Sequence, residues 1–375
     1  MADISAPPVT EPRRSLRGWS SRLIASRGFQ RWAAAFPLTR GIVRREGEAL
    51  FDLLAGFCHS QILMALVQFD IPAMLLDRPM TTDDLARKTR VPRERMTVLM
   101  RAAASLNLVK RKSGDRYALT RRGAALVGVP GLAQMIKHHD VLYRDLADPV
   151  AFFRGEGDTE LANFWPYVFG GAMDPTVAAT YSDLMAQSQV LVAEDTLRAV
   201  SFKGITNLMD VGGGSGAFLH AVGQAHPDIA LTLFDLPEVA PSAQSRFAQS
   251  GQSDRLTINT GSFKTDPVPQ GADAISLIRV LYDHSDETIT QLLAKCYAAL
   301  PDGGRLIISE PMLGGETPQR AGDAYFALYT MAMQTGKTRS AAEIAGLCRA
   351  AGFDKIVTPQ PARPFVTSCL TAAKT

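Results

Sequence analysis

Short apolar runs alternate with amphipathic stretches through the C-terminal half of the chain. The runs predict strands at 205–210, 229–235, 255–259, 273–279, 304–310 and 364–372, and the stretches predict helices at 217–226, 239–250, 286–300 and 341–351. Short connections between such elements favour a mainly parallel sheet with helices on both faces. The pattern therefore predicts an α/β, Rossmann-like domain, with any ligand beyond the carboxyl ends of the strands.

The N-terminal half carries a different pattern, in which residues 49–74 are apolar on nearly every face of a helix. Such a helix must be buried on all sides. Because one chain of this composition offers few elements to surround it, we interpret this segment as the core of a dimer interface.

A winged-helix pattern follows. Residues 81–88 form a short predicted helix capped by Thr81 or Thr82, and Pro92 opens a second one that runs to Leu106. Residues 109–119 then read as two strands joined by a turn. This combination predicts a helical winged-helix domain at the N-terminal side of the Rossmann-like domain.

Winged helices occur in DNA-binding proteins, and this one carries basic side chains at Arg111, Lys112, Arg116, Arg121 and Arg122. Acidic side chains dilute that patch, namely Asp83, Asp84, Glu94 and Asp115. Because a cofactor-binding pattern follows in the same chain, we favour dimerisation over nucleic-acid binding for this domain. A cofactor-sensing DNA-binding regulator remains the alternative.

These patterns divide the chain into four expected parts. They are a basic amphipathic arm (1–45), a helical winged-helix dimerisation domain (46–140), linker and substrate-pocket helices (141–200) and a cofactor domain (201–375).

The composition of the chain excludes several classes of protein. With 375 residues the chain is long enough for two domains with sizeable cores. Its four cysteines, Cys58, Cys296, Cys348 and Cys369, are far apart and show no metal-ligand spacing, so neither a zinc site nor a disulfide framework is indicated. No apolar run reaches the length of a membrane span, and no secretory signal is recognisable, so we expect a cytoplasmic protein without a metal.

The net charge of +3 hides an uneven distribution. Nine of the 40 basic residues are arginines between Pro12 and Arg45, where no acid occurs, and the rest of the chain has 31 basic against 37 acidic residues. Large apolar side chains recur among those arginines, at Leu16, Trp19, Leu23, Trp32 and Phe36. This composition is typical of a helix at an anionic membrane surface. A helix that packs its aromatic side chains on a partner subunit is the alternative, and the sequence leaves both open.

The candidate chemistry begins at Asp210-Val211-Gly212-Gly213-Gly214-Ser215-Gly216, where an expected strand ends and a helix starts. Glycines at such a turn let a ligand approach bare backbone. The next strand ends in Asp235, whose carboxylate can accept hydrogen bonds from ribose hydroxyls. Asp210 suits a cationic or amino-bearing ligand better than a pyrophosphate. We therefore expect S-adenosylmethionine, and an NAD-dependent oxidoreductase is the alternative by fold.

Downstream motifs resemble one family. Its members are the class I small-molecule O-methyltransferases of the plant caffeate and hydroxyindole type. The motifs, in order, are Asp235-Leu236-Pro237, Gly261-Ser262-Phe263, Arg279 to Glu287 and Gly303 to Glu310. Within that family, Gln334 to Ser340 and the Tyr282-Asp283-His284 triplet are most similar to the carotenoid-hydroxyl methyltransferases of purple photosynthetic bacteria, which act on demethylspheroidene and hydroxyneurosporene. A tetrapyrrole C-methyltransferase of green bacteria is the nearest alternative.

The resemblance implies a homodimer that uses S-adenosyl-L-methionine. The cofactor-binding residues it implies are Asp210, Gly212, Gly214, Asp235, Leu236, Ser262, Phe263 and Arg279, with Met185 and Ser188 near the methionine end. It also implies that aromatic side chains before the cofactor domain line a long apolar substrate pocket, for which we name Phe164, Trp165, Tyr167 and Tyr181.

Two departures from the family bear on mechanism. Tyr282 stands where phenol-methylating members have a histidine base, and Thr338 stands where they have the acid that orients that histidine. Ser262 also replaces an aspartate often found near the adenine. The changes suit an aliphatic alcohol, because such a hydroxyl is too weak an acid to be ionised before attack.

The expected catalytic residues are Tyr282, His284 and Glu310. Tyr282 would orient the acceptor hydroxyl and His284 would take the proton, provided that the segment is extended so that both face the same side. Helix capping or packing is the alternative for His284. For Glu310 the alternatives are a structural hydrogen bond and a substrate contact.

Overall fold

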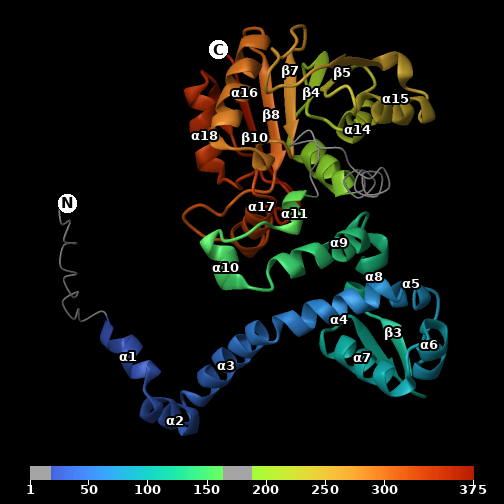
Figure 1. The fold of residues 1–375 in the computed structure, drawn as a ribbon, viewed down its shortest axis with the longest axis vertical. Helices are drawn as coiled ribbons and strands as arrows, with labels where there is room; N and C mark the ends of the chain where they lie inside the picture. Colours follow the sequence, from blue (N-terminus) through green and yellow to red (C-terminus); the bar gives the residue numbers. More distant parts are fainter. Residues whose placement is uncertain (1–17, 164–187) are drawn as a thin grey trace, which may run out of the picture. The chain divides into compact units, whose positions relative to one another are not determined.

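The computed structural model describes residues 18–163 and 188–375 (Figure 1). Contacts within the chain group it into two compact units. The N-terminal unit comprises residues 1–71 and 79–118, and the C-terminal unit comprises residues 72–78 and 119–375.

The N-terminal unit begins with the helices α1 (Trp19–Ala25), α2 (Arg27–Ala35), α3 (Arg40–Leu54) and α4 (Gly56–Gln68). The expected single helix over 49–74 is wrong, because it breaks at Ala55 with a bend of 55° between α3 and α4, and ends at Gln68 before the short α5 (Ile71–Met74). Gly56 follows the first break, where a residue without a β-carbon weakens the helix. Among the described residues no single helix is long and apolar enough to span a membrane; α3 and α4 reach that length and composition only when taken together.

Burial along these two helices is uneven. On α4 the side chains of Met64, Leu66 and Val67 are buried in the unit. At the end of α3 and the start of α4, large apolar side chains are 64–73% exposed, namely Leu50, Phe51, Leu53, Leu54 and Phe57. Burial on all sides is therefore not achieved within one chain. Several large apolar side chains exposed so close together in the chain are typical of an interface between proteins.

The rest of the N-terminal unit is a winged helix, as expected. Its helices are α6 (Thr82–Thr89) and α7 (Arg93–Ser105), and its sheet has the order β1 (Met80–Thr81), β3 (Arg116–Leu119), β2 (Val109–Lys112). Thr81 is the cap of α6, since its hydroxyl accepts a hydrogen bond from the backbone N–H of Asp84 at 3.1 Å.

The C-terminal unit starts with helices that precede the large sheet. They are α8 (Arg121–Gly128), α9 (Leu132–Asp145), α10 (Pro149–Arg154), α11 (Glu160–Asn163) and a further helix over residues 188–199.

The large sheet has seven strands in the order β6 (Leu256–Thr260), β5 (Ala230–Asp235), β4 (Asn207–Val211), β7 (Ala274–Ile278), β8 (Arg305–Glu310), β10 (Ser368–Ala373), β9 (Asp354–Val357). The first five run parallel, and β10 is antiparallel to both of its neighbours. The expected mainly parallel α/β sheet is confirmed. Strand β9 was not expected, since it is largely exposed and has no buried alternate positions that would mark it in the sequence.

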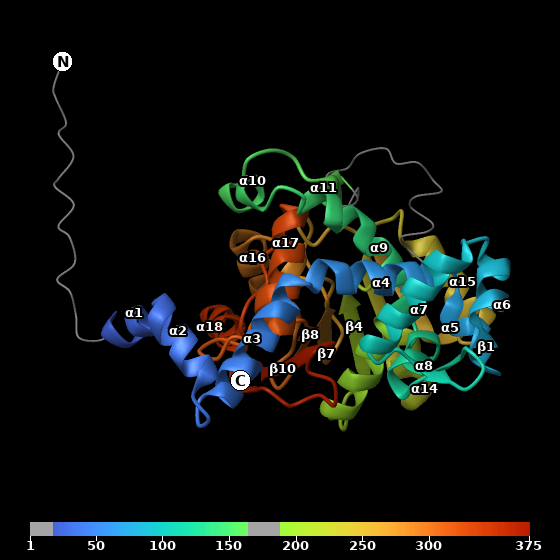
Figure 2. The same cartoon turned by 90° about the horizontal axis from the view of Figure 1, so that it is seen from below.

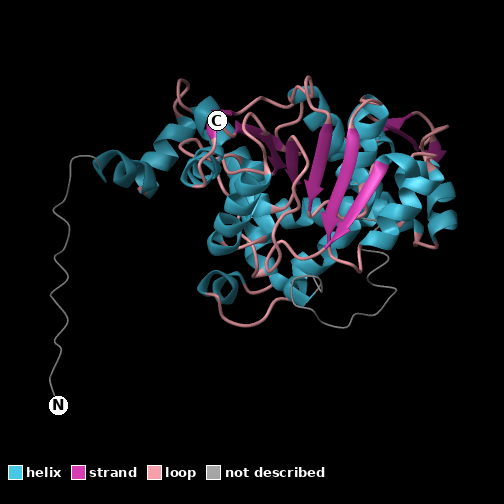
Figure 3. Cartoon of the chain, turned by 90° about the horizontal axis from the view of Figure 1, so that it is seen from above, coloured by secondary structure: helices cyan, strands magenta, loops and turns pink. Residues whose placement is uncertain are grey.

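Helices cover both faces of the sheet (Figures 2 and 3). One face packs on α16 (Asp286–Ala299) and α18 (Ala341–Ala350), through Leu292 and Ile344. The other packs on α14 (Ala217–Ala225), α15 (Ala240–Gln249) and the 188–199 helix, through Val222, Phe247 and Val192. A π-helix over Arg320–Phe326 lies between β8 and α18 and continues into α17 (Ala327–Met333). It was not predicted from the sequence. A π turn lacks the 3.6-residue period from which helices are recognised.

Candidate active site

The backbone of the glycine turn after β4 has no room for side chains at some positions and a conformation that disfavours them at others. Gly212 and Gly214 have φ values of +71° and +59°, in the left-handed region that favours glycine. At Gly213 a β-carbon would lie 2.4 Å from the Asp210 Oδ2 atom. The turn therefore exposes bare backbone beside a carboxylate.

Asp210 is fully buried at the end of β4. Its Oδ1 atom accepts a hydrogen bond of 2.6 Å from the Ser276 hydroxyl, whereas Oδ2 has no hydrogen-bond partner within the described residues. Burial, and to a smaller extent the charge of Asp235, raises the pKa of Asp210 to about 7. A buried acceptor without a donor is costly, so the site fits a ligand that brings a donor or a positive charge.

Asp235 fixes the turn from the neighbouring strand. Its two oxygens accept hydrogen bonds from the backbone N–H groups of Gly214 and Leu236, each at 2.7 Å. Burial raises its pKa. Each carboxylate oxygen keeps a further lone pair, so Asp235 can hold the turn and still accept a ligand hydroxyl.

The Phe263 ring lies against the glycine turn at Gly212. A β-carbon at Gly212 would lie 3.6 Å from its ring, and the ring meets that of His284 edge-on with centroids 5.2 Å apart. Ser262, just before it, is held in its loop, because its backbone N–H donates to Asp266 at 2.8 Å.

Arg279 joins the cofactor side of the sheet to the 188–199 helix. Its backbone is left-handed, with φ of +59°. The guanidinium donates to the Ser188 hydroxyl at 2.9 Å and lies 5.8 Å from the centroid of the Tyr282 ring.

Glu310 shapes the turn that carries Tyr282. Residues Leu281–Asp283 form a 3₁₀ turn after β7, and Glu310 Oε2 accepts hydrogen bonds from the backbone N–H groups of Leu281 (3.0 Å) and Tyr282 (3.2 Å). The condition of an extended segment is therefore not met over Leu281–Asp283, where a single carboxylate oxygen draws both N–H groups together. Glu310 is fully buried, and burial raises its pKa to about 7.

Tyr282 and His284 have different environments in this turn. Tyr282 is 2% exposed, and burial raises the pKa of its phenol. His284 packs against Phe263, and burial together with the charges of Lys264 and Arg339 lowers its pKa to about 4. The His284 ring is therefore neutral near pH 7.

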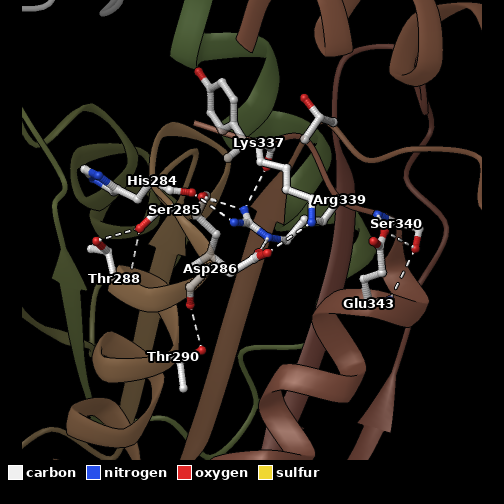
Figure 4. A network of polar contacts seen from close by, with 12 residues as sticks. His284, Ser285, Asp286, Thr288, Thr290, Lys337, Arg339, Ser340 and Glu343 are labelled. Carbon is white, nitrogen blue, oxygen red and sulfur yellow. Dashed lines mark hydrogen bonds and ion pairs between the residues drawn. The ribbon is translucent and has the colours of Figure 1, made fainter. Parts of the chain in front are cut away.

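Arg339 was missed as a site residue, although the motif that contains it had been recognised. Its side chain is 1% exposed and donates to Asp286 Oδ1 at 2.7 Å (Figure 4). It also donates to the carbonyls of Leu281 (3.1 Å), His284 (3.0 Å) and Lys337 (2.7 Å). One buried cation thus clamps both sides of the Tyr282 turn.

Thr338 forms its side-chain hydrogen bonds with the π-helix and α17. Its buried hydroxyl donates to the Phe326 carbonyl at 3.1 Å and lies 3.1 Å from the Thr330 hydroxyl on α17. At the position of the acid that orients the family's histidine, this chain therefore has a link to α17.

Comparison with known proteins decides the family. The sequence profile of the O-methyltransferase domain matches residues 143–354, and that of the O-methyltransferase dimerisation domain matches residues 51–128. The chain belongs to the O-methyltransferase family. Such enzymes use S-adenosylmethionine, and the dimerisation domain makes this O-methyltransferase a homodimer.

Two similar relatives share a name. The demethylspheroidene O-methyltransferase of Cereibacter sphaeroides is 54% identical over 355 residues, which cover 94% of each chain. The enzyme of the same name from Rhodobacter capsulatus is 52% identical, over 90% of this chain and 85% of its own.

Solved structures agree on the fold. Human N-acetylserotonin methyltransferase in complex with S-adenosylmethionine has a TM-score of 0.73 and 22% identity, over 88% of this chain and 97% of its own. CalO1, a methyltransferase in calicheamicin biosynthesis with S-adenosylhomocysteine bound, also has a TM-score of 0.73, with 27% identity over 88% of this chain and 98% of its own.

Two histidine–tyrosine pairs in this O-methyltransferase were not foreseen. His139 on α9 lies 2.7 Å from the Tyr325 hydroxyl of the π-helix, and its neighbour His138 lies 3.0 Å from the Tyr329 hydroxyl of α17. Histidines and tyrosines 186 and 191 residues apart in the chain give no local signal in the sequence.

Several expected residues lie outside the described part of the O-methyltransferase. They are the pocket residues Phe164, Trp165, Tyr167 and Tyr181, and the cofactor residue Met185. Within the described ranges, no group of three or more histidine, cysteine, aspartate or glutamate side chains is placed to hold a metal, and the four cysteines are free thiols.

Proposed function

We propose that this enzyme transfers a methyl group from S-adenosylmethionine to a hydroxyl of a long, apolar carotenoid, in carotenoid biosynthesis. The observation that carries the proposal is the 54% identity, over 94% of both chains, to an enzyme named for demethylspheroidene. Tyr282 supports it, because the phenol of a tyrosine is a much weaker base than the histidine that it replaces.

The cofactor fits the glycine turn. When bound, S-adenosylmethionine supplies a methyl group on a positively charged sulfur, activated toward an oxygen nucleophile. We propose that Asp210 accepts a donor or positive charge through Oδ2, that Asp235 accepts the ribose hydroxyls, and that the remaining cofactor contacts come from Gly212, Gly214, Leu236, Ser262, Phe263, Arg279, Ser188 and Met185.

On the acceptor side, Tyr282 orients the hydroxyl and Glu310 positions Tyr282 through the turn backbone. An aliphatic alcohol needs alignment at the methyl carbon more than early loss of its proton. His284 contacts Phe263, which favours a packing role for this histidine. We retain Phe164, Trp165, Tyr167 and Tyr181 as proposed pocket residues.

The acceptor class is tested by comparing initial rates on a hydroxylated carotenoid and on caffeate-like phenols in the same detergent. We expect methyl transfer to the carotenoid alcohol and none to the phenols, because the histidine that ionises a phenol is absent. Asp235→Ala is the control that ties the activity to this site, since losing the charged acceptor weakens cofactor binding by about 1–3 kcal/mol. Efficient phenol methylation by the unaltered enzyme would overturn the proposal.

We also propose that residues 1–45 form an arm that contacts an anionic membrane, ahead of a dimerisation domain (46–140), linking pocket helices (141–200) and the cofactor domain (201–375). Trp19, Ile24 and Trp32 are 52–68% exposed on α1 and α2. Arg27 and Arg31 are exposed on α2, and the stretch from Pro12 to Arg45 has no acid. Exposed aromatic side chains among arginines match the chemistry of an anionic bilayer surface.

Vesicle binding tests the arm. Replacing Arg27 and Arg31 with glutamine should lower partition onto phosphatidylserine-containing vesicles by roughly 30-fold, because each basic residue near such a surface contributes about 1 kcal/mol. Arg111→Gln with Lys112→Gln, which removes two exposed cations from the wing, is the matched control and should leave partition unchanged. Equal binding to uncharged vesicles, or equal loss in the wing variant, would contradict the proposal.

A further inference from the structure

The two histidine–tyrosine pairs connect α9 to the π-helix and to α17, and α17 contacts the 3₁₀ turn that carries Tyr282. Tyr325 and Tyr329 are four residues apart, with ring centroids separated by 6.3 Å. Their partners His139 and His138 are adjacent on α9. All four residues belong to the C-terminal unit.

Both tyrosines are close to the proposed acceptor side. Burial raises the pKa of Tyr329, and Tyr282 and Asp283 raise it further. Burial likewise raises the pKa of Tyr325 to about 12, while the charge of Arg279 opposes that rise. The geometry agrees, since Tyr329 lies on α17, which contacts the 3₁₀ turn of Tyr282, and the Tyr325 ring is 6.3 Å from the Tyr329 ring.

The surroundings of Tyr325 and His139 keep both side chains neutral. Burial, with a smaller effect of His138, lowers the pKa of His139 to about 4, so its imidazole is neutral. A phenol with a raised pKa keeps its proton. Of the two directions open to a neutral pair, we assign the one in which Tyr325 donates its hydroxyl hydrogen to His139 Nε2, which leaves a basic nitrogen behind the phenol.

The tyrosines of the two pairs differ in their exposure to solvent. Tyr329 is 5% exposed and packs in an apolar cluster with Leu142 and Leu161, which closes its pair inside the unit. Tyr325 is only half-buried and belongs to the π-helix Arg320–Phe326. π turns are often found where a protein positions a functional side chain.

We propose that the Tyr325–His139 pair takes the proton of the acceptor hydroxyl, a step that rests on the proposed function. As the acceptor oxygen forms its bond to the methyl carbon, the bonding pair of the broken carbon–sulfur bond stays on sulfur. The hydroxyl proton passes to Tyr325 Oη, and the Tyr325 proton passes to His139 Nε2. The products are a methyl ether, a neutral thioether and a protonated imidazole, so atoms and charge balance.

A weak base suffices for this step. Once methylated, the acceptor is a protonated ether, which is a far stronger acid than an imidazolium, even one with a depressed pKa. The pair therefore does not need to ionise the alcohol before attack. It provides a nearby destination for the proton.

Two variants and one control test the pair by kinetics. His139→Gln can still accept the Tyr325 hydrogen bond but cannot take a proton, and Tyr325→Phe removes the first carrier. We expect turnover on the carotenoid alcohol to fall about 10²-fold in each, as for loss of a general base, with unchanged affinity for S-adenosylmethionine by calorimetry. His138→Gln is the matched control and should keep turnover within about twofold, since its pair is closed in the core. Undiminished turnover in His139→Gln, or an equal loss in His138→Gln, would overturn the proposal.

A second measurement does not depend on activity. ¹⁵N spectra of the imidazole groups should show that His139 Nε2 carries no hydrogen in the resting enzyme and that its resonance moves in Tyr325→Phe. A protonated Nε2 would overturn the proposal even if the enzyme methylates carotenoids. If the enzyme proves inactive on carotenoids while Nε2 is an acceptor, the proposed function fails instead.

Discussion

Replacing Tyr282 with phenylalanine lowers turnover on the carotenoid alcohol by about 10- to 10³-fold if the tyrosine hydroxyl aligns the acceptor. The ring is 2% exposed, so its packing survives in phenylalanine and the turn is preserved by the backbone bonds to Glu310. The affinity for S-adenosylmethionine should therefore stay unchanged. The measurement is the rate of methyl transfer in detergent, with binding by calorimetry.

Tyr297→Phe is the matched control, because it removes a phenol hydroxyl from a half-buried tyrosine on α16 that packs against Phe353. It should leave turnover unchanged. Tyr282→His should not restore activity on the carotenoid, since an imidazole cannot ionise an aliphatic alcohol beforehand. An undiminished rate in Tyr282→Phe would show that the hydroxyl of Tyr282 has no part in alignment.

Replacing Arg339 with methionine should lower the free energy of unfolding by about 3–5 kcal/mol, because the buried guanidinium makes three charge-assisted hydrogen bonds to backbone carbonyls, each contributing about 1.5 kcal/mol. The change removes the guanidinium donor from three backbone carbonyls, at Leu281, His284 and Lys337. Because these carbonyls flank Tyr282, turnover should fall as well. Denaturant unfolding monitored by circular dichroism measures the loss of stability.

Lys337→Met is the control for that experiment. Lys337 forms an ion pair of 3.0 Å with the same Asp286, but both side chains are more than half exposed. Exposed pairs contribute about 0–1 kcal/mol, so this variant should unfold almost as the parent does. Equal destabilisation by the two variants would show that the buried position of Arg339 is not what matters.

The parallel sheet and the glycine turn could be predicted because their signals are local. Runs such as 229–235 are apolar over the length of one strand, and the glycines after Asp210 are consecutive in the chain. The signals that predict the winged helix are also local in the sequence, since Thr81 both caps α6 and ends β1.

The remaining features depend on contacts that are distant in sequence. His139 and Tyr325 are 186 residues apart, and Arg339 reaches Asp286 across 53 residues. The prediction for residues 49–74 was wrong for another reason. Their apolar composition indicated burial, but it did not distinguish one helix from two. Nor did it distinguish burial within one chain from burial between two chains. The 3₁₀ turn at Tyr282 arises from Glu310, which follows it in the next strand.

Transfer of a labelled methyl group tests the central claim most directly. The purified enzyme is incubated with methyl-¹³C S-adenosylmethionine and a pigment extract that contains hydroxylated carotenoids, tetrapyrroles and phenols, and the labelled product is isolated. The account predicts one added methyl group on a carotenoid oxygen, seen as a labelled methoxy carbon. Label on a tetrapyrrole carbon or a phenol oxygen, with the carotenoids unlabelled, would contradict it.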